Sequence, residues 1–248
     1  MRIGITEQGD SSIDYSWVDK LNSVDGAIII TKNLTDKFID TFIEQSKSHK
    51  LILHCTCTGW GHSTFEPNIP TYKEQLSQLK KLTQKGFNPK YIVLRIDPII
   101  PTKAGLQRVE HVLSLFKELD LDITRIRISI YDEYPHVKER LINMGYSPCY
   151  SNFQANETQL KSVIDVLSKF DYKYEVCAEG QLYKLKPEIF STNGCVSYKD
   201  LKLFNIEANN LRINNQNRLG CCCLSCKTEL LENKKRCPYK CTYCYWQD

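Results

Sequence analysis

The sequence predicts an α/β fold: a complete or partial parallel (β/α) barrel of the TIM-barrel type, with a cysteine-rich C-terminal segment. Short apolar runs alternate along the chain with segments of helical period, and such alternation is typical of parallel strands. Several strands are also apolar on one face and become polar on the other toward their ends. That pattern suits a barrel whose outer face packs on helices and whose mouth holds a site. An open sheet with helices on both faces would prefer strands that are apolar throughout.

Six strands are expected from the apolar runs. Side chains alternate between the two faces of a strand, so Ile96 lies on the apolar face of its run while Arg95 and Asp97 share the opposite face. Cys55 and Cys57 are expected to pack as small hydrophobic residues, and His54, which faces away from Cys55, is expected under a helix. The expected strands are Arg2–Thr6, Gly26–Thr31, Leu51–Cys57, Tyr91–Asp97, Arg125–Tyr131 and Tyr172–Ala178.

Helices are expected between these strands, because apolar residues recur there at the i, i+3, i+4 spacing that turns one stripe toward a sheet. The expected helices are Thr35–Lys47, Tyr72–Lys85, Leu106–Leu119, His136–Met144 and Glu157–Phe170. Further along, Ser191–Cys195 is loop-like and Tyr198–Phe204 could form a short helix or strand. We expect residues 1–190 to form the barrel core and residues 191–248 to form a cluster-binding segment packed on it as one structural unit.

The composition is that of a globular protein and excludes few functions. No apolar run approaches the roughly 18 residues of a membrane span, and the N-terminal residues lack the basic and apolar segments of a signal peptide. We therefore expect a cytoplasmic protein with no membrane partner. The net charge of +4, from 33 basic and 29 acidic residues, is too small to indicate nucleic acid by itself. In a reducing compartment the twelve cysteines are more typical of metal ligands than of disulfides.

The cysteines are concentrated at the C-terminal end, where seven of the twelve lie between Cys221 and Cys244. Cys237, Cys241 and Cys244 follow a C-x-x-x-C-x-x-C spacing, with Tyr243 directly before the third cysteine. Three thiolates are one too few to close a tetrahedral site or a four-iron cluster. The spacing therefore favours a 4Fe-4S cluster with one iron left open for an outside ligand, and it resembles the cluster motif of radical S-adenosylmethionine (SAM) enzymes.

Zinc is the main alternative. Cys223 and Cys226 are spaced C-x-x-C, as are Cys241 and Cys244, and two such pairs are close to a four-cysteine zinc pattern. On that interpretation the chain is a zinc-stabilised barrel that binds a partner or nucleic acid through the basic segment Lys227–Lys240. A third interpretation is a non-catalytic iron–sulfur electron carrier.

Several stretches in one order make the chain resemble an uncharacterised bacterial family known as domain of unknown function eighteen-forty-eight. Two departures concern Gly4–Asp10 and Ser225–Thr228, and they bear on a shared substrate more than on a shared cofactor. The matching stretches are Thr31–Asn33, Glu66–Pro70, Arg95–Ile99, Cys177–Glu179, Cys195, Cys221–Cys223 and Cys237–Tyr245.

The resemblance implies a barrel-like fold and a radical SAM-like iron–sulfur protein. Its cofactors would be a 4Fe-4S cluster on the three C-terminal cysteines and SAM, whose reductive cleavage gives a 5′-deoxyadenosyl radical. Its partners would be SAM, an unknown substrate, and an external reductant such as a ferredoxin or flavodoxin. Four further family-matched cysteines are enough for a second site, either a second iron–sulfur cluster or zinc; they are Cys177, Cys195, Cys221 and Cys223.

Other candidate cofactor-binding residues lie at strand ends and in loops. Glu66 is a candidate to accept hydrogen bonds from the SAM amino group, although it could equally be a solvated loop carboxylate. Arg95 and Asp97 could orient SAM, touch substrate, or form an ion pair that braces the barrel, because a buried charge needs a partner. Lys32, Asn33 and Glu179 are weaker candidates for contact with the cofactor.

Overall fold

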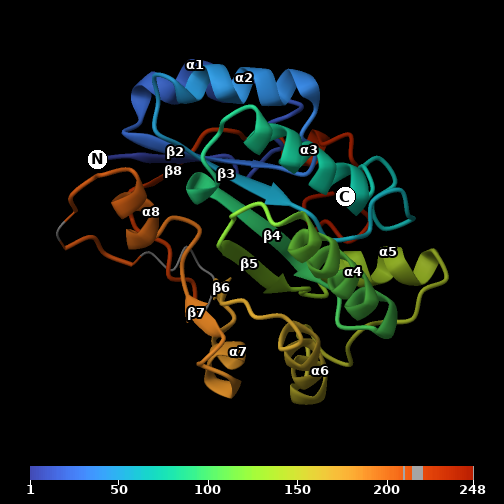
Figure 1. Cartoon of the computed structure of the whole chain (residues 1–248). Helices are drawn as coiled ribbons and strands as arrows, with labels where there is room; N and C mark the ends of the chain where they lie inside the picture. The colour runs from blue at the N-terminus through green and yellow to red at the C-terminus, as the bar shows by residue number, and fades with distance from the viewer. Residues whose placement is uncertain (209, 214–219, 248) are drawn as a thin grey trace.

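The computed structural model describes residues 1–208, 210–213 and 220–247, and the strands within them form one parallel sheet in the order β7-β6-β5-β4-β3-β2-β1-β8. Figure 1 shows the middle strands running side by side, with their arrowheads on the side where the chain ends. The strands are β1 (Ile3–Ile5), β2 (Gly26–Thr31), β3 (Leu51–Thr56), β4 (Ile92–Ile99), β5 (Arg125–Ile130), β6 (Tyr174–Val176), β7 (Phe190–Thr192) and β8 (Lys227–Glu229).

This strand order is that of a (β/α) barrel opened between β7 and β8. Every pair from β1 to β7 is parallel and sequential, and β8 returns to pair with β1 through Ile3 and Lys227. Within the described residues no strand pairing joins β7 to β8. The seam is instead spanned by a loop contact, in which the Leu224 backbone N–H donates to the Val196 carbonyl oxygen at 3.0 Å. The prediction of an α/β fold with parallel strands and a cysteine-rich C-terminal segment is confirmed, and the strand order agrees with a partial barrel.

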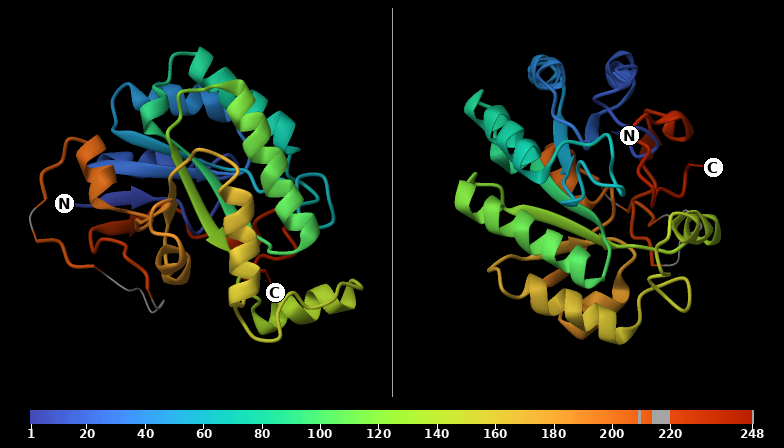
Figure 2. Two further views of the ribbon diagram at one scale, coloured as in Figure 1. Left: turned by 60° about the horizontal axis from the view of Figure 1, so that its bottom comes forward. Right: turned by 90° about the vertical axis from the view of Figure 1, so that its right-hand side faces the viewer.

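The helices follow the strands and cover the outer face, as the views in Figure 2 show for the arc from α1 to α4 and for α6. The five long helices fall where helical periodicity predicted them, and Tyr198–Leu203, which was expected to form a short helix or strand, is helical. The helices of the described chain are α1 (Trp17–Lys20), α2 (Asp36–Ser46), α3 (Tyr72–Gln84), α4 (Lys103–Leu119), α5 (Pro135–Asn143), α6 (Glu157–Leu167), α7 (Gly180–Leu185) and α8 (Tyr198–Leu203). None of them has both the length and the apolar character needed to cross a membrane.

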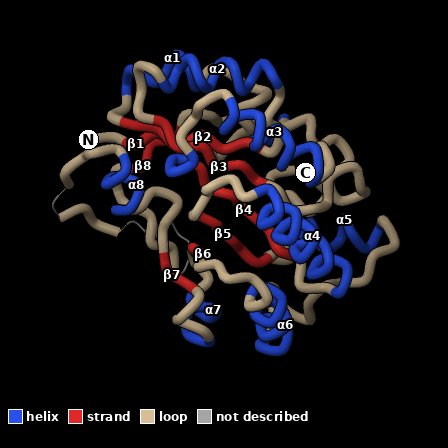
Figure 3. The backbone as a smooth tube through the Cα atoms, viewed as in Figure 1, coloured by secondary structure: helices blue, strands red, loops and turns tan. Residues whose placement is uncertain are grey.

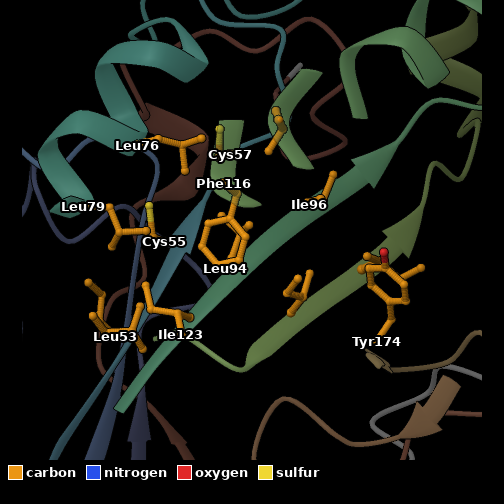
Figure 4. Packing of buried hydrophobic residues seen from close by; sticks show 14 of the residues in the cluster. Leu53, Cys55, Cys57, Leu76, Leu79, Leu94, Ile96, Phe116, Ile123 and Tyr174 are labelled. Atoms are coloured by element: carbon orange, nitrogen blue, oxygen red, sulfur yellow. The ribbon is translucent and has the colours of Figure 1, made fainter. Parts of the chain in front are cut away.

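The main core lies between the sheet and these outer helices. Figure 4 shows Cys55 of β3, and Cys57 of the loop that follows it, beside Leu76 and Leu79 of α3. All four side chains are buried, so the two cysteines do pack as small hydrophobic residues, as predicted. Full burial of each large apolar side chain contributes about 1.5–3 kcal/mol to folding, which makes this layer the main source of stability.

The inner face of the sheet carries an apolar cluster and, next to it, a layer of buried charged side chains. Ile3, Ile28 and Val93 form a second apolar cluster with Phe204, which follows α8 and closes that end of the barrel. Above this cluster lies a buried charged layer, in which Glu175 of β6 accepts from Arg125 and Arg127 of β5 at 2.8 Å each.

Two sequence predictions need correction. His54 lies inside the barrel and not under a helix: it is fully buried, and burial together with the cations Arg127, Arg95 and Arg125 of the inner face lowers its pKa. Cys55 occupies the helix-covered face, so alternation turns His54 inward. The stretch 191–195, expected to be a loop, contributes Ser191 and Thr192 to β7. A strand of three residues carries too little periodicity to be recognised, and its pairing with β6 decides its conformation.

Candidate functional site: a cysteine-lined cavity at the barrel mouth

A cavity of about 210 Å³ lies at the C-terminal ends of the strands. Figure 3 shows this end of the sheet surrounded mainly by loops, with the C-terminus among them. Five cysteines line the cavity, three from the C-terminal motif and two from the ends of β6 and β7. They are Cys237, Cys241, Cys244, Cys177 and Cys195. The fold therefore brings two cysteine groups that are far apart in sequence to the walls of one cavity.

The C-terminal motif is packed into the mouth of the barrel. Cys241 is buried, and Cys237 and Cys244 are half-buried in the same cluster as Trp60, an aromatic residue of the loop that follows β3. Burial raises the pKa of the Cys241 thiol to about 12, with a smaller opposing effect from Lys32. A metal that bound here would have to displace this proton, because thiolates and not thiols are metal ligands.

Backbone hydrogen bonds fix the motif to the barrel. The Thr242 N–H donates to the Phe65 carbonyl oxygen at 3.0 Å, and the Asn68 amide donates to the Pro238 carbonyl oxygen at 2.9 Å. From α5, the Arg140 guanidinium donates to the carbonyl oxygens of Thr242 at 2.9 Å and Cys244 at 3.1 Å. The motif is held from both sides, so its three thiols face the cavity from a fixed loop.

Glu66, Lys32 and Tyr243 form a buried polar cluster behind the motif. Lys32 Nζ lies 2.7 Å from Glu66 Oε1 and donates to the Tyr243 hydroxyl at 2.9 Å, and Tyr243 in turn donates to Glu66 Oε1. Burial alone would lower the pKa of Lys32, but the neighbouring groups, Glu66 foremost with Cys241 and Asp97, together raise that pKa above its ordinary value. Lys32 therefore keeps its charge. Lys32 and Tyr243 line the cavity, whereas Glu66 stands behind them.

Of the remaining predicted cofactor-binding residues, two line the cavity and two do not. Arg95 and Asp97 both line it and form the ion pair that was one of the predicted alternatives. Asn33 is not among the residues that line the cavity, and its side chain is hydrogen-bonded to Tyr239. Glu179 is also outside the lining, because its carboxylate accepts from the Ile130 N–H at 2.9 Å and from Ser129 Oγ at 3.2 Å.

The second cysteine group is assembled more tightly than the first. The sulfur atoms of Cys177, Cys195 and Cys223 all lie within 4.8 Å of one another, and this is the only such cysteine group within the described residues. Cys221 is hydrogen-bonded through its thiol to both Cys177 and Cys223. The structure does not bring together the four cysteines of the alternative zinc pattern, because Cys226 packs in the inner apolar cluster and Cys241 packs at the mouth.

Arg127, Tyr131 and Asp10 are among the cavity-lining residues that were not predicted as site residues. Arg95 Nε, Arg127 Nε and the Tyr131 hydroxyl are buried without a hydrogen-bond partner in the described part of the chain, and only Arg95 was a predicted site residue. Arg127 and Tyr131 share a strand face that becomes polar, which was a usable signal. Asp10 was also missed: it accepts from Thr31 Oγ1 at 2.7 Å and from the Lys32 N–H at 2.8 Å, and so positions the loop that carries Lys32.

Cys177, Cys195 and Cys223 are close enough together to hold a metal ion, and the three cysteines of the C-terminal motif line the same cavity as Cys177 and Cys195. No significant match to a curated protein is found for the sequence. A sequence model described as "Domain of unknown function (DUF1848)" matches residues 12–246. That range includes both cysteine groups and every strand except β1, and the chain therefore belongs to this family of uncharacterised domains.

Proposed function

We propose that the chain is a radical SAM-type enzyme that carries a 4Fe-4S cluster on Cys237, Cys241 and Cys244. The observation that carries the proposal is that these three thiols, fixed by a hydrogen-bonded loop, line a cavity at the mouth of a parallel barrel. Sites in barrels of this kind lie at the C-terminal ends of the strands. Three thiolates leave one iron without a protein ligand, and that iron is available to SAM.

With a cluster held by these cysteines, an electron from an external reductant such as a ferredoxin would pass to the sulfonium of SAM, where a carbon–sulfur bond would break to give methionine and a 5′-deoxyadenosyl radical. The protein's own residues hold, orient and screen these groups. The Arg140 guanidinium and the Phe65 carbonyl oxygen fix the backbone of the cysteine loop. Tyr243, Trp60 and Tyr239 shield one side of the loop from solvent, because they are buried beside it.

Lys32 supports the proposal through its pairing with Glu66 and its place in the cavity wall. Its ammonium is paired with the fully buried Glu66 and lies in the same wall as Tyr243. Four-iron clusters with three thiolates carry negative charge, so a retained lysine cation beside Cys241 would favour the bound cluster electrostatically. Glu66 then acts by positioning Lys32 and Tyr243, since it does not line the cavity itself.

The other wall of the cavity supports a polar substrate. Arg95 and Arg127 each have a buried Nε without a partner among the described residues, and Tyr131 has a buried hydroxyl in the same state. An unsatisfied buried polar group costs about 1–3 kcal/mol. A ligand with carboxylate or phosphate oxygens would remove that cost, so we propose that the substrate, or the carboxylate of SAM, is bound by these groups.

The proposal is tested by anaerobic reconstitution of the full chain with iron and sulfide, followed by incubation with SAM and dithionite. We expect 5′-deoxyadenosine and methionine in equal amounts, at a rate that falls at least a hundredfold in Cys237→Ala, Cys241→Ala and Cys244→Ala. Cys149→Ala is a matched control, because Cys149 is half-buried and is not among the residues that line the cavity. A fully loaded cluster that does not cleave SAM would contradict the proposal, and would favour an electron carrier.

A further inference from the structure

The second cysteine group has the geometry of a site for a single metal ion. The sulfur atoms of Cys177, Cys195 and Cys223 lie within 4.8 Å of one another. Four thiolates around one zinc ion, at a Zn–S distance of about 2.3 Å, have sulfur atoms about 3.8 Å apart. In a 4Fe-4S cluster each cysteine binds a different iron, so the sulfur atoms must stand further apart around a larger body. The observed spacing therefore favours one ion over a cluster.

The close packing of the loops agrees with a small occupant. Gly194 lies against the segment that carries Cys222 and Cys223, where an added Cβ would come within 2.5 Å of the Cys222 carbonyl oxygen and the Cys223 Cα. The Cys195 N–H also donates to Cys223 Sγ across 3.1 Å. Hydrogen bonds of this type to a sulfur ligand are a common second layer of metal–thiolate sites.

The fourth ligand is best provided by Cys221. Its thiol is hydrogen-bonded to those of both Cys177 and Cys223, whereas the thiol of Cys222 is hydrogen-bonded to that of Cys177 alone. Cys221 is also the more buried of the two. Four thiolates with one divalent ion carry a net charge of −2, and basic groups are close enough to offset it. The Arg127 guanidinium donates to the Cys195 carbonyl oxygen at 3.4 Å, and Lys227 interacts electrostatically with Cys195 and Cys223.

The position of the group in the fold gives it a structural role. Cys177 directly follows β6, Cys195 follows β7, and Cys221 and Cys223 precede β8. The two open edges of the sheet, β7 and β8, are thus connected through these thiols. The Leu224–Val196 hydrogen bond crosses the same seam. A shared ion would tie the loops on both sides together at the place where strand pairing is missing.

We infer that Cys177, Cys195, Cys221 and Cys223 bind one zinc ion that closes the seam of the barrel between β7 and β8. Soft thiolate ligands in tetrahedral geometry select zinc among the common divalent ions. Binding converts four thiols to thiolates and releases their protons. The inference does not depend on a cluster at the C-terminal motif, since no residue is shared between the two groups.

The test is metal analysis of the full chain, purified anaerobically, in the triple variant Cys237→Ala/Cys241→Ala/Cys244→Ala. We expect about one zinc per chain and no iron or sulfide in this variant, because the seam group is intact. Replacement of zinc with Co²⁺ should give the intense visible absorption bands of a tetrahedral thiolate site. Iron with sulfide in the triple variant, or no bound metal at all, would overturn the inference.

Single substitutions identify the ligands. Cys177→Ser, Cys195→Ser, Cys221→Ser and Cys223→Ser should each weaken Co²⁺ binding at least tenfold, whereas Cys222→Ser should bind it as the unsubstituted chain does. Circular dichroism compares the fold of each variant with that of the unsubstituted chain. Where a serine variant fails to fold, the aspartate variant at the same position, which retains an anionic ligand, is titrated with Co²⁺ instead. Equal loss in Cys222→Ser and Cys221→Ser would contradict the ligand set. SAM cleavage without zinc would overturn this inference alone, and zinc without SAM cleavage would overturn the proposed function alone.

Discussion

The phenol of Tyr243, within the cysteine motif, donates a hydrogen bond to the carboxylate of Glu66, which is fully buried 177 positions earlier in the chain. Lys32 completes the cluster by pairing with the same oxygen of Glu66 at 2.7 Å. The position of the cysteine loop is therefore coupled to two charges supplied by the loops that follow β2 and β3. Substitutions in this cluster should therefore change the stability of the cysteine loop, and this change can be measured separately from the stability of the barrel.

Tyr243→Phe should loosen the cysteine loop without unfolding the barrel. The variant loses two hydrogen bonds to charged groups, one donated to Glu66 and one accepted from Lys32, and each is worth about 1.5–3 kcal/mol. We expect faster hydrogen exchange in residues 237–247 and unchanged exchange in β3 and β4. Tyr183→Phe is the control, because Tyr183 is exposed. Unchanged exchange in the loop would show that the Tyr243–Glu66 contact does not hold it.

Lys32→Met should destabilise the protein more strongly than Tyr243→Phe does, because it leaves the Glu66 carboxylate buried without a cation. Breaking a buried pair in this way costs about 3–5 kcal/mol. Changing Glu66 to Gln in the same chain should recover most of the loss, since the uncompensated charge is then removed.

Chemical unfolding of the single and double variants measures both effects. Lys81→Met is the matched control, because its pair with Asp36 is exposed and such pairs contribute at most about 1 kcal/mol. A double variant that is no more stable than Lys32→Met would contradict the charge-burial explanation.

Removal of residues 237–248 should leave a folded barrel without the C-terminal metal site. The last strand, β8, ends at Glu229, so the sheet is retained. The deletion removes the buried side chains of Tyr239 and Tyr243, each worth about 1.5–3 kcal/mol. We expect cooperative thermal unfolding at a lower midpoint, zinc at the seam, and no SAM cleavage. Retained cleavage would exclude the C-terminal motif as the cluster site.

Glu229 should make the stability fall as the pH rises toward neutrality. Burial raises its pKa from an ordinary 4.5 to about 7 in the folded chain, against smaller opposing effects from backbone hydrogen bonds. The folded state therefore keeps a proton between pH 4.5 and about 7 that the unfolded state has released. Where the folded state binds more protons, stability decreases with rising pH. The loss is complete above the folded pKa.

Glu229→Gln removes this titration and keeps an oxygen that can accept from the Leu231 N–H, which donates to Glu229 at 3.2 Å. The variant should therefore gain stability over the unsubstituted chain at pH 8 and show a smaller gain at pH 5. Urea midpoints at the two pH values measure the difference, with the exposed Glu118→Gln as control. An equal gain at both pH values would rule out titration as its cause.

The sequence predicted the parts of the fold that have their own periodicity. Runs such as 91–97 alternate apolar and polar residues, and this was enough to place Arg95 and Asp97 on the inner face. By contrast, β7 and β8 contain three residues each and owe their conformation to pairing with β6 and β1. No local pattern could reveal them. For the same reason the open seam could be found only in the structure.

The same distinction between local and long-range information decides which site residues could be predicted from the sequence. The spacing of Cys237, Cys241 and Cys244 is local, and the structure places all three in the wall of one cavity. The grouping of Cys177 with Cys195 and Cys223 required knowledge of which strand ends meet. His54 lies on the opposite face of β3 from Cys55, as alternation predicts, but the local pattern does not show which of the two faces the helices cover.

The most direct test of the central claim is electron paramagnetic resonance of the reduced, reconstituted chain with and without SAM. A 4Fe-4S cluster held by three thiolates has one iron that SAM can ligate, so SAM should change the spectrum of the cluster. The same change should be absent in Cys241→Ala. A reduced 4Fe-4S signal that SAM leaves unaltered would contradict the claim that Cys237, Cys241 and Cys244 hold a SAM-binding cluster.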